Sequence, residues 1–472
     1  MLCLARTTIQ AEALVTQEDS LSVNSDELQN DIQKINDHYQ SLYQTGRFNG
    51  NILIATKGQI VYEKSFGYAV KSSGEKLDKN STFQLASTSK PFTAAAILIL
   101  QEQGKLDIDD LVTQYYPNFP YKRVTIRNLL SHRSGIPDYL TLGKYFPQKY
   151  ISNQDVMKMF EIQRPRALNT PNTVFRYNNS NFAVLAALVE KISGESFPDF
   201  LKEHIFEPLH MNNTWVWHPN QGIKDDQTLG YDYAWRPRES DKFDGVYGDK
   251  GVYSTAEDLL KWDQSWYTHL LLKPKTIALA YTGQTGGREK DYGLGWRMHY
   301  LDNDKKLIFH NGWWHDYNIV FKRFIDDSLT IIILSNKYNQ SVYNTDFVEN
   351  RMLDNQEPDP AKSYYASVVS HPKKVEQKKE SVKNPESIEV KNLKKIIDYN
   401  PFGSKAKEAD SEDNFSQKVN DVKYYIVKKG DTLYNIAQRF QVTIDMLKKW
   451  NKIASVNIFL GQKLLIDNII ND

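Results

Sequence analysis

Two groups of apolar, β-branched segments stand far apart in this sequence, and they constrain its fold more than any other feature. Their strands are predicted at 51–56, 59–63, 306–310, 318–321 and 329–334. Helical patterns dominate the stretch between the groups, and a leading helix is predicted before the first. We expect an α+β fold, in which one antiparallel sheet is flanked by helices and interrupted by a helical subdomain, with a site in the cleft between them.

Length and a change of composition divide the chain into four regions. At 472 residues it is too long for one ordinary core. We expect a main domain at 28–355, a charged flexible linker at 356–421 and a small module at 422–468. Residues 1–27 form an N-terminal segment whose short apolar start ends at Arg6, so no signal peptide is evident. Both a plain cytoplasmic start and the remnant of an export signal stay open.

Charge and cysteine content exclude several classes of function. The 59 basic and 58 acidic side chains leave a net charge of +1, which gives no bulk attraction to nucleic acid or to an anionic membrane. Cys3 is the only cysteine, so an internal disulfide or a cysteine-based zinc site is impossible. No apolar run is long enough to span a bilayer. His310 and His315 lack further metal ligands, and we expect no metal and no cofactor.

A serine followed three residues later by a lysine occurs four times, and context separates the four pairs. They are Ser73–Lys76, Ser87–Lys90, Ser370–Lys373 and Ser404–Lys407. Only Ser87 directly precedes an Ala-rich apolar run, which predicts a buried helix with Pro91 in its first turn. Helical spacing then brings Lys90 within reach of the Ser87 hydroxyl, and burial would favour a neutral, proton-accepting amine. The alternative is a serine that caps the helix beside an exposed lysine.

Two further short segments carry groups that acyl-transfer chemistry could use. Tyr177 precedes a predicted core helix and could shuttle a proton, while Asn179 could hold Lys90 or a substrate amide. His310 is expected at the end of a strand, and Gly312 would let a substrate approach the backbone. The Trp313 amide could then pair with the Ser87 amide as an oxyanion hole. The alternatives are a loop tyrosine packed on a helix start and a histidine bonded locally.

Taken in order, Ser87-x-x-Lys90, Tyr177-x-Asn179 and His310-x-Gly312 resemble the motifs of the serine β-lactamase-related family. The family includes class C β-lactamases, DD-carboxypeptidases, D-stereospecific peptidases and some esterases. The likeness covers roughly residues 28 to 350 and includes framework segments at 129–137, 251–259 and 292–296. It implies a β-lactamase/transpeptidase-like fold, with Ser87 as nucleophile and Lys90 and Tyr177 sharing acid and base work. It also implies that Asn179 is a positioning residue of the site and that His310 assists the reaction electrostatically.

One departure from the family pattern bears on the substrate. Class C β-lactamases have Lys-Thr-Gly where this chain has His310-Asn311-Gly312, which is more similar to the peptidases and esterases. We therefore expect a D-peptidase or DD-carboxypeptidase acting at peptidoglycan. A carboxylesterase or weak β-lactamase of the same family is the alternative, and a peptidoglycan-binding receptor without turnover is a further one.

The end of the chain resembles a LysM module, with a predicted order of strand, helix, helix and strand between Tyr425 and Leu464. Asp431 or Thr432 would cap its first helix. The resemblance implies binding to peptidoglycan or another glycan that contains N-acetylglucosamine. The glycan-binding residues that it implies are Gly430, Asp431, Thr432, Asn457 and Ile458. This combination favours a periplasmic, secreted or cell-wall-associated protein of a bacterium.

Overall fold

The computed structural model describes residues 25–353 except 220–221, 288–289 and 302–304, and a second set near the C-terminus. That second set comprises 418–419, 422–428, 433–440, 442, 444–451, 453, 458 and 462–467. The chain forms two compact units, Met1–Glu357 and Pro358–Asp472. Most of the predicted linker at 356–421 and of the N-terminal segment at 1–27 lies outside the described residues.

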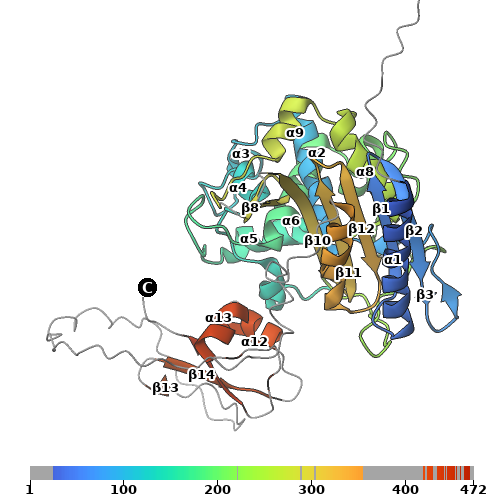
Figure 1. The fold of residues 1–472 in the computed structure, drawn as a ribbon. Helices are drawn as coiled ribbons and strands as arrows, with labels where there is room; N and C mark the ends of the chain where they lie inside the picture. Colours follow the sequence, from blue (N-terminus) through green and yellow to red (C-terminus); the bar gives the residue numbers. More distant parts are fainter. Residues whose placement is uncertain are drawn as a thin grey trace, which may run out of the picture. The chain divides into compact units, whose positions relative to one another are not determined.

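A seven-stranded antiparallel sheet, in the order β2-β1-β12-β11-β10-β9-β8, forms the centre of the first unit (Figure 1). Its strands are β1 (Gly50–Thr56), β2 (Gln59–Phe66), β8 (Lys290–Tyr292), β9 (Arg297–Tyr300), β10 (Lys306–Trp314), β11 (Tyr317–Phe324) and β12 (Leu329–Ser335). The pairing of Gly50 with Ser335 joins the first and last groups of strands. The α+β architecture expected from the two strand groups is therefore confirmed.

Both faces of the sheet are buried, which explains why its central strands read as nearly continuous apolar runs. Ile52 and Ile54 of β1 belong to the core under α1 (Ser25–Gln44) and α10 (Asp346–Met352). Leu53 of β1 belongs instead to the larger core, which contains residues of the inserted helices. Successive side chains of β1 thus point to opposite faces of the sheet, and each face contributes to a different hydrophobic core.

The helical insertion lies between β2 and β8 and covers the second face of the sheet. Its α-helices are α2 (Lys90–Glu102), α3 (Val112–Tyr115), α4 (Ile126–Leu130), α5 (Asn153–Gln163), α6 (Asn179–Ser193), α7 (Phe197–Leu201), α8 (Ala256–Thr268) and α9 (Pro274–Ala280). Its other helical turns are η1 (Ala86–Ser89), η2 (Tyr139–Tyr145) and η3 (Lys202–Phe206), and η4 (Gln340–Tyr343) follows the sheet. The short strands are β3 (Tyr68–Val70), β4 (Glu75–Lys76), β5 (Phe83–Gln84), β6 (Trp215–Val216) and β7 (Val252–Ser254).

The strand that carries His310 is longer than the sequence predicts. We expected it to end at His310, but β10 pairs with β11 as far as Trp314 opposite Tyr317. The ladder continues because His315 and Asp316 both adopt positive φ angles, of 46° and 62°, as a tight two-residue hairpin turn requires. Gly312 is therefore a residue inside a strand and not part of a loop.

The second unit has the predicted order of strand, helix, helix and strand. These elements are β14 (Val422–Ile426), α12 (Leu433–Phe440), α13 (Ile444–Asn451) and β15 (Lys463–Asp467). A short strand, β13 (Lys418–Val419), precedes them within the range predicted as linker and pairs with β14. Leu433 and Leu447 of the helices and Leu464 of β15 share one small core.

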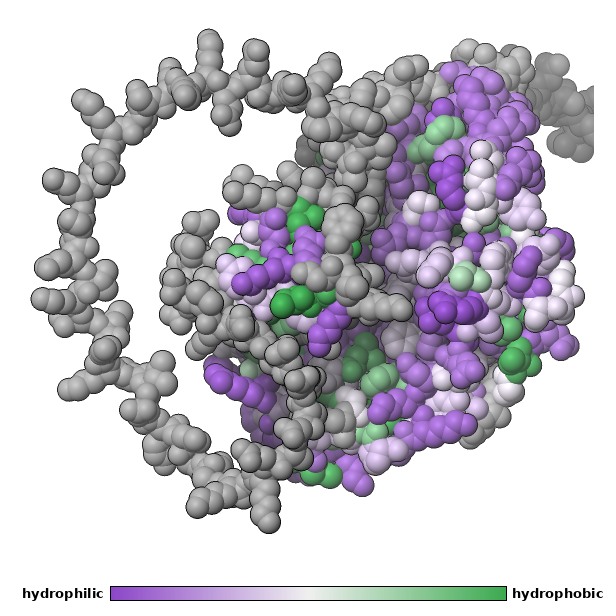
Figure 2. All heavy atoms as spheres, turned by 90° about the horizontal axis from the view of Figure 1, so that it is seen from below, coloured by the Kyte–Doolittle hydropathy of each residue, from purple (hydrophilic) through white to green (hydrophobic). Residues whose placement is uncertain are grey.

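One face of the molecule is largely polar where its residues are described. Figure 2 shows a face on which hydrophilic residues prevail and hydrophobic side chains are scattered among the described atoms. Within the described ranges, no helix combines the length and the hydrophobicity that crossing a membrane would require.

Candidate active site

Ser87 lies in a short helical turn that leads directly into a buried helix. The turn η1 is followed without a break by α2, whose residues Lys90 to Leu100 are all buried. Pro91 occupies the first turn of α2, where its missing N–H costs no hydrogen bond. Ala86, just before Ser87, adopts a φ of 49°, an uncommon conformation for alanine that often marks a functional segment.

Contacts with the sheet and with β7 hold η1 in place. The Thr88 hydroxyl donates to the carbonyl of His310 at 3.3 Å, and the Leu85 N–H donates to the carbonyl of Val252 at 2.8 Å. Gly312 of β10 lies so close that a Cβ there would be 2.1 Å from the Leu85 oxygen. The segment that holds Ser87 is therefore in direct contact with β10 at Gly312.

The Lys90 amine lies at the centre of the site and is fully buried. Its Nζ is 3.0 Å from Ser87 Oγ, 3.0 Å from Asn179 Oδ1 and 2.9 Å from the carbonyl oxygen of Asp249. The bond to Ser87 rules out the alternative in which Lys90 is an exposed side chain. The helix cap is Ser89, not Ser87, and its side chain makes no capping bond.

Tyr177 lies beside Lys90 in the site. Lys90 Nζ is 4.9 Å from the centre of the Tyr177 ring, and the Arg297 guanidinium is 4.8 Å from it. The Tyr177 hydroxyl oxygen is buried and has no hydrogen-bond partner among the described residues. A buried hydroxyl without a partner is uncommon, and it is available to a substrate or water.

Asn179 connects Lys90 to a carboxylate. The preceding Asn178 caps α6 by accepting the Ser180 N–H at 2.8 Å, which places Asn179 in the first turn. The Asn179 Nδ2 and backbone N–H groups donate to Asp138 Oδ2 at 3.2 and 2.9 Å. Burial is the main cause that raises the pKa of Asp138 above its usual range.

His310 is fully buried, and both of its ring nitrogens have hydrogen-bond partners. Its Nδ1 donates to the Asn311 carbonyl at 2.9 Å, and its Nε2 lies 3.3 Å from the Tyr292 hydroxyl oxygen. In a neutral ring, Nε2 then accepts from that hydroxyl. Burial, followed by the charges of Arg297 and Lys90, holds the pKa of His310 well below its usual value. A positively charged His310 is therefore disfavoured. The electrostatic assistance by His310 that the resemblance implies stays a prediction.

Four residues near the site were not predicted from the sequence. Asp138, Asp249 and Arg297 are described above, and the ring of His132 lies 4.3 Å from that of Tyr177. Asp138 directly follows the framework segment at 129–137, and Arg297 directly follows the one at 292–296. Extending those segments by one residue would have identified both.

Trp313 follows Gly312 on β10, and its side chain is 43% exposed. The contact of Gly312 with Leu85 brings this part of β10 to the segment that holds Ser87. The pairing of the Ser87 and Trp313 amides as an oxyanion hole stays a prediction. Of the residues predicted to bind glycan, Gly430, Asp431, Thr432 and Asn457 lie outside the described residues, and Ile458 is partly buried against the core of the second unit.

Two clusters of the described residues have the composition of a metal site, and neither includes Ser87 or its partners. They are Glu195, Glu203 and His204, and Asp241, Asp244 and His315. In the second cluster, the Trp314 and His315 ring nitrogens donate to Asp244 at 2.7 and 2.9 Å. These bonds satisfy the Asp244 carboxylate without an ion.

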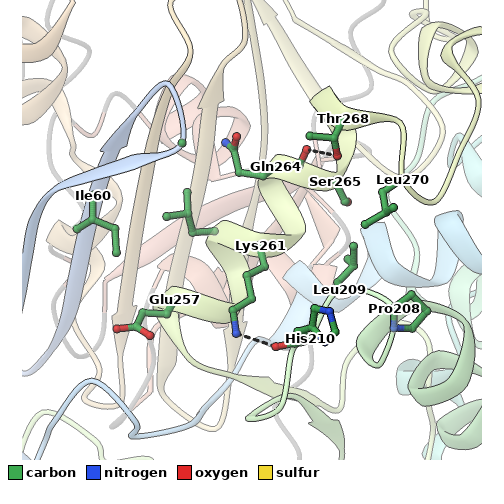
Figure 3. A pocket seen from close by; sticks show the side chains of 12 residues that line it. Ile60, Pro208, Leu209, His210, Glu257, Lys261, Gln264, Ser265, Thr268 and Leu270 are labelled. Atoms are coloured by element: carbon green, nitrogen blue, oxygen red, sulfur yellow. Dashed lines mark hydrogen bonds between the residues drawn. The ribbon is translucent and has the colours of Figure 1, made fainter.

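A cavity of about 670 Å³ lies beside α8. Its lining residues do not include Ser87 or any of the side chains described above around Lys90. Figure 3 shows Lys261 on its wall, where the Lys261 amine donates to the His210 carbonyl at 2.7 Å. Ile60 and Leu270 contribute apolar surface. We therefore do not assign the chemistry of Ser87 to this cavity.

Comparison with known proteins identifies both parts of the chain. The Beta-lactamase family model matches residues 28–350, and the LysM domain model matches residues 425–467. The first match covers more than half of the 472 residues, so the chain belongs to the Beta-lactamase family. It also carries a C-terminal LysM domain, which indicates binding to peptidoglycan or related glycans.

Curated relatives include penicillin-binding proteins of Bacillus subtilis (strain 168). The chain is 36% identical over 330 residues to penicillin-binding protein 4*, a match that covers 65% of this chain and 73% of that protein. It is 30% identical over 256 residues to the putative penicillin-binding protein PbpX, covering 52% of this chain and 61% of that protein. These homologues support a penicillin-binding-protein-like serine hydrolase.

Solved structures share the fold of the first unit. A penicillin binding protein from Bacillus halodurans matches with a TM-score of 0.61 and 23% identity, over 66% of this chain and 98% of that one. FmtA from Staphylococcus aureus matches with a TM-score of 0.57 and 25% identity, over 71% of this chain and 91% of FmtA. The D-amino acid amidase from Ochrobactrum anthropi SV3 matches with a TM-score of 0.57 and 23% identity, over 69% of this chain and 97% of the amidase. The two matches at 23% identity show the fold alone.

Proposed function

We propose that the first unit hydrolyses an acyl bond through a covalent intermediate on Ser87. The observation that carries the proposal is the environment of the Lys90 amine, 3.0 Å from Ser87 Oγ and facing two carbonyl oxygens. In its neutral form Lys90 has two N–H groups and one lone pair. The oxygens of Asn179 and Asp249 accept the two N–H groups, which leaves the lone pair directed at the Ser87 hydroxyl.

In the acylation step, Ser87 Oγ bonds to the substrate carbonyl carbon as its proton moves to Lys90. The Ser87 and Trp313 amides would stabilise the oxyanion. When the intermediate collapses, the bond to the leaving group breaks, and the Tyr177 hydroxyl, which is unpartnered among the described residues, is suited to relay the proton to that group. Water, activated by the same two groups, Lys90 and Tyr177, then attacks the acyl carbon, which releases the acyl group and restores Ser87.

The substrate class that we propose is a D-amino-acid-containing peptide, most specifically a peptidoglycan stem cleaved by DD-carboxypeptidase chemistry. Histidine in place of the lysine of class C β-lactamases supports this choice, and so does the LysM domain. We propose that this domain holds the enzyme at the cell wall, outside the cytoplasm. The intact set of Ser87, Lys90, Tyr177 and Asn179 argues against a receptor without turnover.

A comparison of three substrates tests the substrate class. Purified protein is incubated with a pentapeptide ending in D-alanyl-D-alanine, with p-nitrophenyl butyrate and with nitrocefin. We expect release of D-alanine with a kcat/KM above those for ester and β-lactam hydrolysis. Faster turnover of the ester would instead establish a carboxylesterase, and rapid nitrocefin hydrolysis would establish a β-lactamase. Absence of turnover on all three would favour the receptor.

A further inference from the structure

We propose that Asp138 is a positioning residue that decides which end of the Asn179 amide faces Lys90. The proposal rests on the proposed function, because it concerns how the lone pair of Lys90 is aimed at Ser87. Asp138 does not touch Lys90 or Ser87 in any hydrogen bond of the described residues. It acts through Asn179, which accepts from Lys90 at 3.0 Å.

The hydrogen bonds of Asp138 determine the orientation of the amide. Asp138 Oδ2 receives the Asn179 backbone N–H at 2.9 Å and the Asn179 Nδ2 at 3.2 Å, and Oδ1 receives the Leu140 N–H at 3.0 Å. An ionised carboxylate can only accept hydrogen bonds. The NH₂ end of the Asn179 amide must therefore face Asp138, and its oxygen must face Lys90.

The opposite orientation would disable the base. If the amide of Asn179 were flipped, its NH₂ group would face the Lys90 amine as a second donor. The Lys90 lone pair would then accept from Asn179, and an N–H group would face Ser87. The hydroxyl of Ser87 would lose the acceptor that it needs for nucleophilic attack.

The residue next to Asp138 supports the other carbonyl that faces Lys90. The Tyr139 hydroxyl donates to Asp249 Oδ2 at 3.0 Å and accepts from Lys250 Nζ at 2.6 Å. Asp249 supplies its main-chain oxygen to Lys90 at 2.9 Å. Asp138 and Tyr139 thus anchor the two residues whose carbonyl oxygens orient the amine.

A purely structural role is the competing explanation, because Asp138 also caps η2 through the Leu140 N–H. The test must therefore separate orientation of Asn179 from stability. A swap of the two side chains does so. In Asp138→Asn/Asn179→Asp, the carboxylate at 179 presents an acceptor to Lys90 at either oxygen. The NH₂ group of the amide at 138 can donate to that carboxylate from the position of Oδ2, while its oxygen, at the position of Oδ1, accepts the Leu140 N–H. The backbone N–H of residue 179 then loses its acceptor, a cost that the Tm measurement records.

The experiment measures the second-order rate constant for covalent labelling by a fluorescent penicillin, together with Tm, for the full-length protein. We expect Asp138→Asn to slow labelling about 10- to 100-fold. The swap variant should be labelled at least about 5-fold faster than Asp138→Asn and faster than Asn179→Asp, in which two carboxylates oppose each other.

Asp258→Asn is the matched control, because Asp258 is a buried carboxylate that accepts the Asn213 N–H at 2.8 Å and the Thr214 hydroxyl at 2.9 Å. It should lower Tm and leave the labelling of folded protein unchanged.

Each outcome decides the proposal. The proposal is overturned if the Asp138→Asn variant is labelled at the wild-type rate. It is also overturned if Asp138→Asn is labelled slowly and the swap variant is labelled no faster. If Asp138→Asn does not fold, the comparison of the swap with Asn179→Asp decides, and a swap that is not faster overturns the proposal. Failure of the wild-type protein to be labelled at Ser87 would instead remove the proposed function itself.

Discussion

At the scale of single residues, the site contains both groups with hydrogen-bond partners and buried groups without one among the described residues. The Lys90 amine has three oxygen partners, whereas the Tyr177 hydroxyl has no partner among the described residues. Tyr116, which lies outside the site, differs from Tyr177, since its hydroxyl donates to the Ala187 carbonyl at 2.9 Å. Function and stability should therefore separate at these two tyrosines.

Tyr177→Phe should change activity and leave stability nearly unchanged. The substitution removes no hydrogen bond to any of the described residues, so the free energy of unfolding should change by less than about 0.5 kcal/mol. Loss of the proton relay should slow turnover about 100-fold. Steady-state kinetics and urea unfolding measure the two effects. Tyr116→Phe should show the reverse, a loss of about 1 kcal/mol in the free energy of unfolding with normal turnover. Equal changes in turnover and in stability for the two variants would contradict the assignment of Tyr177 as the proton relay.

The buried histidines predict how stability depends on pH. Burial holds the pKa of His132 and of His310 well below 6.5, so both stay neutral in the folded state while the unfolded chain protonates them. The free energy of unfolding should therefore fall as the pH drops below about 6.5, by about 1.4 kcal/mol per pH unit for each histidine.

His132 and His269 offer a matched pair for this measurement. Both have positive φ angles, of 56° and 58°, which asparagine tolerates, but only His132 is buried. Urea unfolding between pH 5.5 and 7.5 should show a shallower slope for His132→Asn and the wild-type slope for His269→Asn. The same slope for both variants would be inconsistent with a neutral, buried His132.

At the scale of elements, the site depends on the contact between β10 and η1. Gly312→Ala would place a Cβ 2.1 Å from the Leu85 oxygen, and backbone cannot yield as a flexible side chain does. We expect a loss of about 1–3 kcal/mol in stability, together with slow acylation because Ser87 is displaced. At Gly143, the nearest atom to an added Cβ is the tip of Phe243 at 3.3 Å, so Gly143→Ala should retain normal acylation. Wild-type kinetics in Gly312→Ala would show that the contact does not position Ser87.

Local pattern predicted the elements well, and long-range contacts explain what it missed. The spacing of Ser87 and Lys90 indicated their helix, and the alternation of apolar residues indicated the strands. The sequence indicated that Asn179 could hold Lys90, and the two form a hydrogen bond. The other partner, Asp249, lies 159 residues from Lys90, a separation over which periodicity carries no information. The neutral state of His310 likewise depends on burial and on Arg297, which the motif alone does not reveal. The end of β10 was misplaced because glycine usually interrupts a strand.

At the scale of the whole molecule, catalysis and attachment are assigned to different units. The Beta-lactamase match ends at residue 350 and the LysM match begins at 425. Deleting residues 422–472 should therefore abolish sedimentation with insoluble peptidoglycan and leave hydrolysis of a small substrate unchanged. Sedimentation assays and steady-state kinetics on the same preparation test this. Unchanged sedimentation of the truncated protein would remove the LysM domain as the tether.

The central claim, an acyl-enzyme on Ser87, is tested most directly by mass spectrometry of the intact protein after reaction with penicillin. We predict that the wild-type protein gains the mass of one penicillin and that the modified peptide contains Ser87. Ser87→Ala should gain none, although it retains Lys90, Tyr177 and Asn179. Equal modification of both proteins, or attachment at another residue, would contradict the account.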